Sequence, residues 1–168
     1  MKGGHEQVKF DDFDSEATPI GSSFVVKSIH RMATMLTRST VAELAGTGRF
    51  NLPEWRVVVW LNALGTSSQR RLVDLTGGEQ AQISRVLSDL ERRGLVQSGQ
   101  SAQDKRARVF SLTAQGADSF ADVCPDVSQL YGRIDAVLSE AELAQFISML
   151  NRLADALPGE ESGPRPAR

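Results

Sequence analysis

The stretch that decides the fold is EQAQISRVLSDLERRGLVQSGQSAQDKRARVFSLT, residues 79–113. In its first half, four apolar residues recur at the three- and four-residue steps of one helix face. These are Ile83, Val86, Leu87 and Leu90. After Gly94 the hydrophobic period changes to two, which is typical of strands. The stretch therefore predicts an amphipathic helix over residues 79–93, followed by a β-hairpin with its tip at residues 102–106.

Two further helices are predicted just before this stretch. In NLPEWRVVVWLNALG, Asn51 and Glu54 have capping-box spacing, and Pro53 lies in the first turn, where a missing N–H costs nothing. The helix over residues 52–64 is apolar on nearly every face, so we expect it to be buried. Thr66 and Gln69 have the same capping-box spacing and predict a short helix. This helix turns Leu72, Val73 and Leu75 inward and ends at Gly77 and Gly78.

The two ends of the chain predict longer helices. From Ile20 to about Ala45 an apolar stripe predicts a first helix, ended by Gly46 and Gly48. Thr113 begins a helix that reaches about Leu138, and Pro125 should kink it. A capping box over SEAE, residues 139–142, opens a last helix. Its apolar stripe comprises Leu143, Ile147, Leu150, Leu153 or Ala154, and Leu157. Residues 1–19 form a polar arm expected to be mobile, and residues 158–168 have the composition of a disordered tail.

Composition excludes several classes of protein. The 168 residues are 40% hydrophobic, which is enough for a core, and no apolar run approaches the length of a membrane helix. No secretory signal is evident, and the single cysteine, Cys124, excludes an intrachain disulfide, which fits a cytoplasmic protein. The net charge is −2, but residues 21–108 carry more basic than acidic side chains while both ends are acidic. A basic face can therefore exist within an acidic chain.

The order helix, helix, Gly-Gly turn, helix, hairpin, helix predicts a winged helix-turn-helix, mainly α with a small β-hairpin wing. A helix fits the major groove of B-DNA, which makes double-stranded DNA the expected partner. The residues expected at base edges are Gln80, Gln82, Ser84 and Arg85. The residues expected on DNA from the wing are Asp104, Lys105, Arg106 and Arg108. Asp104 can hold one of these arginines in place by a charge-assisted hydrogen bond.

The alternative to DNA binding is a winged-helix module that contacts another protein through the same polar helix face. We expect no enzyme, because no nucleophile–base pair, phosphate loop or pair of carboxylates is visible. No cofactor is expected, and two histidines with one cysteine form no metal-ligand cluster.

Four segments resemble the MarR family of bacterial transcription regulators: LPEWRVVVWL, ISRVLSDLERRGLV, DKRARVFSLTAQG and the last leucine-patterned helix. The resemblance spans about residues 24–157. It implies a homodimer whose two winged motifs bind a pseudo-palindromic operator, usually as a repressor. It also implies that Arg106 is the wing arginine with Asp104 as its anchor, and that Ser84 and Arg85 form the Ser/Thr-Arg pair of the helix. The Gly-Gly of LTGGEQAQ departs from the family's usual Leu-Gly and could change the helix angle.

The resemblance divides the chain into an N-terminal dimerisation helix over residues 20–50, a DNA-binding lobe over 51–113 and C-terminal dimerisation helices over 114–157. The dimer also has support from the residues, because the apolar stripe of the last helix is unfavourable in water. Packing of that stripe against the chain's own first helix is the alternative.

The resemblance further implies a small aromatic or phenolic acid as effector. The candidate effector residues are His30, Arg31, Trp55 and Trp60, although core packing is the alternative for each tryptophan. Some members of the family sense peroxide through a thiol, but Cys124 in the fifth helix fits a packing role better.

Overall fold

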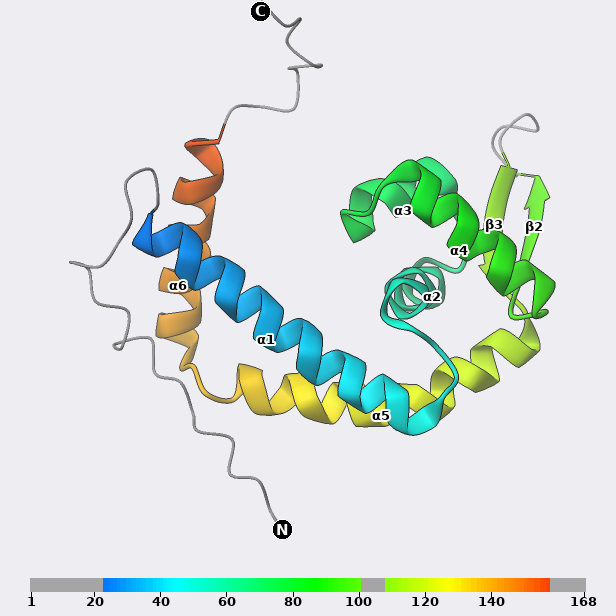
Figure 1. Ribbon diagram of the computed structural model, residues 1–168, viewed down its shortest axis with the longest axis horizontal. Helices are drawn as coiled ribbons and strands as arrows, with labels where there is room; N and C mark the ends of the chain where they lie inside the picture. Colours follow the sequence, from blue (N-terminus) through cyan, green and yellow to red (C-terminus); the bar gives the residue numbers. More distant parts are fainter. Residues whose placement is uncertain (1–22, 101–107, 158–168) are drawn as a thin grey trace, which may run out of the picture. The chain divides into compact units, whose positions relative to one another are not determined.

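The computed structural model describes residues 23–100 and 108–157, which form six helices and a three-stranded sheet (Figure 1). The chain divides into two compact units, one ending at Val127 and one beginning at Ser128. The predicted arm, the predicted tail and the hairpin tip with Asp104, Lys105 and Arg106 lie outside the described residues. Within the described ranges, no helix has both the length and the apolar character needed to cross a bilayer.

Helix α1 covers Phe24–Thr47. The Ser23 hydroxyl accepts a hydrogen bond from the Val26 N–H at its start, and Gly48 ends it in the left-handed conformation, with φ 63°. The expectation that Gly46 also ends this helix is wrong, because Gly46 lies inside the last helical turn. Of these two glycines, only Gly48 has the positive φ that an L side chain rarely adopts.

Helix α2, Leu52–Leu64, is the centre of the first unit and contacts α1, α3, α4 and the sheet (Figure 1). The predicted capping box is present, because Asn51 and Glu54 exchange side-chain and backbone hydrogen bonds. Four of its apolar side chains are buried, which confirms the buried helix. They are Trp55, Val57, Val58 and Leu61.

The N-cap of helix α3, Gln69–Thr76, lies two residues later in the chain than predicted. The N-cap is Ser68, whose hydroxyl accepts from the Arg71 N–H at 3.3 Å, and Thr66 does not cap the helix. Ser67 and Ser68 instead form β1, a two-residue strand paired with β3. This strand exists because the tertiary fold brings a partner to it, and two serines carry no strand signal of their own.

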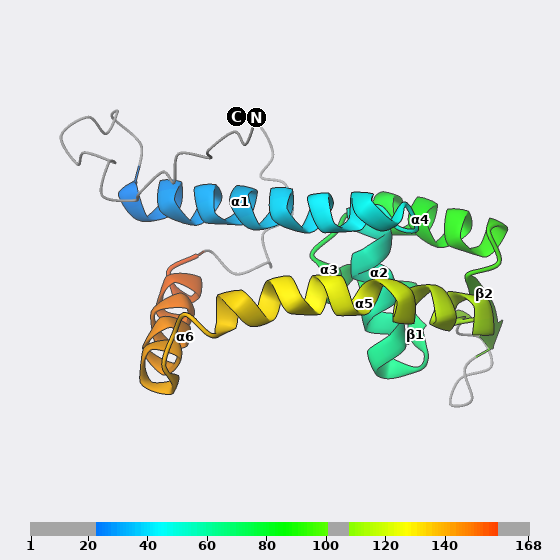
Figure 2. The same ribbon diagram turned by 90° about the horizontal axis from the view of Figure 1, so that it is seen from below.

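Helix α4, Gln80–Arg92, and the hairpin that follows it confirm the predicted winged helix-turn-helix. All four predicted core positions of α4 are at most 8% exposed. Strands β2, Val96–Gln100, and β3, Arg108–Leu112, pair antiparallel in the sheet order β1-β3-β2. Strand β2 contacts α4 and lies beside the C-terminal end of this helix (Figures 1 and 2).

Helix α5, Ala114–Asp135, begins where β3 ends, and it continues through Pro125 as one helix. Thr113, between β3 and α5, is hydrogen-bonded both to the residues that precede β2 and to the first turn of α5. Its N–H donates to the Leu95 carbonyl at 3.1 Å, its hydroxyl donates to the Gly94 carbonyl at 2.6 Å, and the hydroxyl accepts from the Gly116 N–H at 3.0 Å. Gly116 is required here, because a Cβ atom at this position would overlap the Leu95 carbonyl oxygen.

Helix α6, Glu140–Asp155, belongs to the second unit. Its predicted capping box is present between Ser139 and Glu142. The hydroxyl of Ser139 donates to the Glu142 carboxylate at 2.7 Å. This hydrogen bond is the main cause that holds the pKa of Glu142 below its ordinary value. None of the residues of α6 is buried in the single chain.

Candidate nucleic-acid interface

The polar face of α4 is open to solvent along its whole length. Gln80, Gln82, Ser84 and Arg85 are all exposed, on the side opposite the buried apolar stripe. The Arg85 Nε donates to the Ala81 carbonyl at 3.2 Å. This bond lays the stem of Arg85 along the first turns of the helix while its terminal nitrogens remain available. The predicted base-reading residues that belong to the helix therefore share one accessible surface.

The turn before α4 fixes this helix against α3. Gly77 has φ 64°, and a Cβ at Gly78 would lie 3.0 Å from the Cδ1 of Ile83. Gly77 therefore supplies the left-handed cap of α3, and Gly78 leaves room for a core side chain of α4. The Gln69 side-chain amide also donates to the Gln80 carbonyl at 3.4 Å, which connects the first turns of the two helices.

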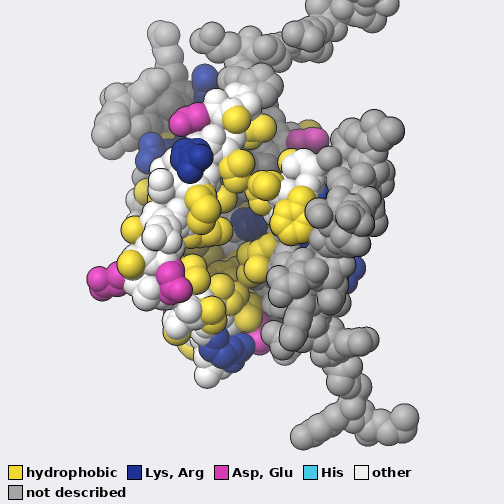
Figure 3. All heavy atoms as spheres, turned by 90° about the vertical axis from the view of Figure 1, so that its left-hand side faces the viewer, with side chains coloured by type: hydrophobic (Ala, Val, Ile, Leu, Met, Phe, Trp, Pro, Cys, Tyr) yellow, Lys and Arg dark blue, Asp and Glu magenta, His cyan; other side chains and the backbone are white. Residues whose placement is uncertain are grey.

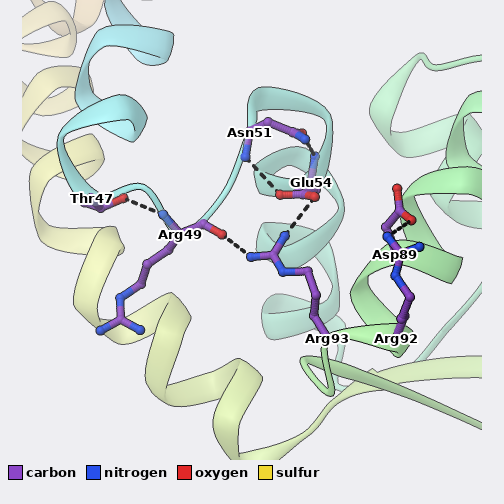
Figure 4. Close-up of polar contacts among 7 residues, drawn as sticks. All are labelled: Thr47, Arg49, Asn51, Glu54, Asp89, Arg92 and Arg93. Carbon is purple, nitrogen blue, oxygen red and sulfur yellow. Dashed lines mark hydrogen bonds and ion pairs between the residues drawn. The ribbon is translucent and has the colours of Figure 1, made fainter.

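The C-terminal end of α4 is bound to the corner between α1 and α2 (Figure 4). Arg93 donates to the Glu54 carboxylate at 2.9 Å and to the Arg49 carbonyl oxygen. The other oxygen of Glu54 accepts from the Asn51 N–H at 2.9 Å. The Glu54 side chain is 8% exposed, so both carboxylate oxygens depend on these donors inside the protein.

The neighbouring arginines have different partners. Arg92 pairs with Asp89 of its own helix at 2.7 Å, and both side chains are at least half exposed (Figure 4). The Arg49 side chain pairs with Asp122 of α5 at 2.6 Å. Arg92 is therefore a surface residue of α4, whereas Arg93 belongs to the internal frame that holds α4.

Arg108 is the one predicted wing contact that the described residues include. Its Nη2 lies 3.0 and 2.9 Å from the two carboxylate oxygens of Glu91 in α4, and it donates to the Ser98 hydroxyl of β2 at 3.0 Å. The guanidinium also lies over the Phe110 ring, 4.9 Å from its centroid. The sequence identified the charge of Arg108 but not this pairing, since its partner Glu91 is distant in the chain.

Comparison with known proteins identifies this arrangement. Residues 50–107 match the sequence model of the MarR family. The transcriptional regulator YwaE of Bacillus subtilis is 19% identical over 162 residues, which cover 91% of this chain and 95% of YwaE. The solved structures that share the fold include a variant of MarR from E. coli complexed with operator DNA. It is 20% identical, with a TM-score of 0.66, and the match covers 80% of this chain and 94% of that chain. Another is NadR in complex with 4-hydroxyphenylacetate, which is 21% identical, with a TM-score of 0.68, over 83% of this chain and 99% of that chain.

Residues 50–107 thus carry a lobe that matches the MarR family, and these comparisons support a DNA-binding transcription regulator, as the sequence predicts. In the winged helix-turn-helix, α4 holds the place of the recognition helix, and β2 and β3 form the wing.

The four candidate effector residues differ in their burial within the first unit. His30 is exposed and Arg31 half-buried on α1, while Trp55 is 5% exposed and stacks on Phe120 with ring centroids 5.4 Å apart. Trp60 is half-buried against the same core. A cavity of about 640 Å³ lies at the corner between α1 and α2, and none of the four lines it. For Trp55 the structure favours the core role.

Cys124 also packs, half-buried, against the core of the first unit. Among the described residues, no three His, Cys, Asp or Glu side chains gather as metal ligands do.

Proposed function

We propose that this chain is a ligand-responsive homodimeric repressor of the MarR family that binds a pseudo-palindromic operator. The observation that supports DNA reading most strongly is the exposed face of α4, held rigid by a buried apolar stripe on its other side. Arg85 on this face can pair with guanine, and Gln80 or Gln82 with adenine, each good bidentate pair giving about 1–3 kcal/mol of discrimination. The wing, with Asp104, Lys105 and Arg106, contacts the neighbouring minor groove.

The homodimer is supported by apolar surface that the single chain leaves uncovered. On α6, Leu143, Ile147 and Leu150 are 46%, 50% and 40% exposed. Several apolar residues of α1, in the first unit, are exposed as well, and Figure 3 shows uncovered hydrophobic side chains. Exposed apolar surface of this extent marks an interaction site, and a second copy brings a second recognition helix for a two-fold symmetric site.

The ligand response is supported by the fold shared with NadR, whose structure holds 4-hydroxyphenylacetate. We expect a small aromatic acid of this kind to release the DNA. The assay is a titration of 4-hydroxyphenylacetate into the protein–operator complex, with phenylethanol as an uncharged control. If neither compound nor other aromatic acids change DNA affinity, the regulator does not respond to this class.

The DNA test begins with selection of DNA fragments by the purified full chain, followed by affinity measurements over a range of salt. We expect a symmetric motif with half-sites about one helical turn apart. Arg85→Ala should weaken operator binding by about 5- to 150-fold and relax specificity at one base pair. Arg106→Ala should reduce the salt slope by about 0.9.

Arg38→Ala serves as the control, since Arg38 is an exposed cation on α1, outside the helix-turn-helix. It should leave the affinity and the salt slope unchanged. Failure to select any DNA, together with capture of a protein through the α4 face, would replace the proposal with the protein-interaction module.

A further inference from the structure

Arg108 joins three elements through one guanidinium. It is the first residue of β3, its carboxylate partner Glu91 lies in the last turn of α4, and its hydroxyl partner Ser98 lies in β2. We infer that Arg108 is a positioning residue for DNA binding, which together with Glu91 fixes the wing on the recognition helix and does not itself contact DNA. The inference rests on the proposed function, because it requires α4 and the wing to bind one duplex together.

The Arg108 side chain is 62% exposed, but its contacts hold the guanidinium against the protein. Its Nη2 is bonded to both Glu91 oxygens and to Ser98, and the flat guanidinium lies over Phe110, a core residue that is 4% exposed. To reach a phosphate, the side chain would have to leave a carboxylate, a hydroxyl and an aromatic ring together. Charge-assisted bonds of this kind are stronger than bonds between neutral groups, and the ring contact adds to them.

The charge of Glu91 supports the same assignment. An unpaired carboxylate in the last turn of a recognition helix repels the phosphates of the duplex that the helix approaches. Paired with Arg108, Glu91 presents no net charge to DNA. The acid is therefore expected to help binding through geometry, although electrostatics alone would make it harmful. Geometry and electrostatics thus predict opposite changes in DNA affinity when the charge of Glu91 is removed, and an affinity measurement distinguishes them.

The experiment measures the affinity of the full chain for its selected operator over a range of salt, for the wild type, Glu91→Gln, Arg108→Met and the double variant. We expect each single variant to lose about fivefold in affinity, and the double variant, which leaves neither charge unpaired, to keep the wild-type salt slope. The double variant should lose no more than either single variant, since both remove the same interaction. Thermal unfolding of each variant shows whether it is folded.

Two further variants separate positioning from direct contact. Asp89→Asn is the matched control, because it removes an acid from the same helix whose partner, Arg92, makes no bond to the wing. It should leave affinity unchanged or raise it, whereas Glu91→Gln should lower it. Arg108→Lys keeps the positive charge but loses the planar fork, so it should bind more weakly than the wild type at an equal salt slope.

The opposite results identify a phosphate contact and overturn the inference. In that case the double variant lowers the salt slope by about 0.9, Arg108→Lys binds like the wild type, and Glu91→Gln behaves like Asp89→Asn. A wild-type protein that selects no DNA would overturn the proposed function and this inference together. Loss of binding in Arg85→Ala, with Glu91→Gln unaffected, would overturn this inference alone.

Discussion

Replacing Gly116 with alanine tests the joint between the wing and α5. A Cβ atom there would overlap the Leu95 carbonyl oxygen and would lie 2.9 Å from the carbonyl carbon and 3.3 Å from the Cα of Leu95. All three are backbone atoms, so no side-chain rotation can relieve the clash. The start of α5 must move away from the strand that follows α4.

The expected cost follows from what this movement breaks. Three hydrogen bonds join Thr113 to Gly94, Leu95 and Gly116, and each contributes about 1 kcal/mol. Alanine itself favours a helix over glycine by about 1 kcal/mol, which offsets part of the loss. We therefore expect Gly116→Ala to lower the free energy of unfolding by about 2–3 kcal/mol, or the melting temperature by about 4–12 °C.

The assay is urea unfolding followed by circular dichroism, at one fixed protein concentration because the expected dimer makes stability depend on concentration. Gly132→Ala is the matched control, since it lies in the same helix and a Cβ there meets nothing within 4 Å. It should leave stability unchanged or raise it by up to about 1 kcal/mol. Equal effects of the two substitutions would refute the steric reasoning.

Two further predictions concern side-chain contacts that stabilise the fold. Arg93→Met removes a donor from Glu54 and should lower the free energy of unfolding by about 1–3 kcal/mol, whereas Arg92→Met, at an exposed pair, should change it by less than about 0.5 kcal/mol. Urea unfolding measures both, and equal losses would contradict an internal role for Arg93. Ser139→Ala removes the main cause of the lowered pKa of Glu142, so that pKa should rise towards 4.5 in an NMR titration. Because the pKa of Glu142 is lower in the folded than in the unfolded protein, its carboxylate stabilises the fold at a pH above the unfolded pKa, and this stability is lost as the pH falls through the folded pKa. The variant should therefore lose less stability than the wild type as the pH falls below about 5. An unchanged pKa would show that the Ser139 hydroxyl does not hold the carboxylate.

The sequence predicts the helices well where one residue pattern determines both the element and its burial. The stripe of Ile83, Val86, Leu87 and Leu90 and the capping boxes at Asn51 and Ser139 are local signals, and the structure contains each of them. Strand β1 could not be predicted in this way. Ser67 and Ser68 become a strand only because β3 lies beside them.

In the candidate site, too, some features follow from one short stretch of sequence, whereas others depend on contacts between residues far apart in the chain. The exposure of Gln82 and Arg85 follows from helical periodicity, which a single stretch contains. The pairing of Arg108 with Glu91 depends on how the hairpin folds back over α4, and the sequence shows only that both residues are charged. Likewise, Trp55 could be a pocket residue or a core residue until its stack on Phe120 is seen.

The Leu95–Thr113 hydrogen bond closes the open end of the hairpin, next to the first strand pair, Val96 with Leu112. Strand alignment is thus set at this end, where Gly116 tolerates no added atom. Extra residues inserted between positions 100 and 108 would lengthen the reach of the hairpin without shifting either strand. Relatives could in this way acquire wings of different lengths while the rest of the DNA-binding lobe stays the same.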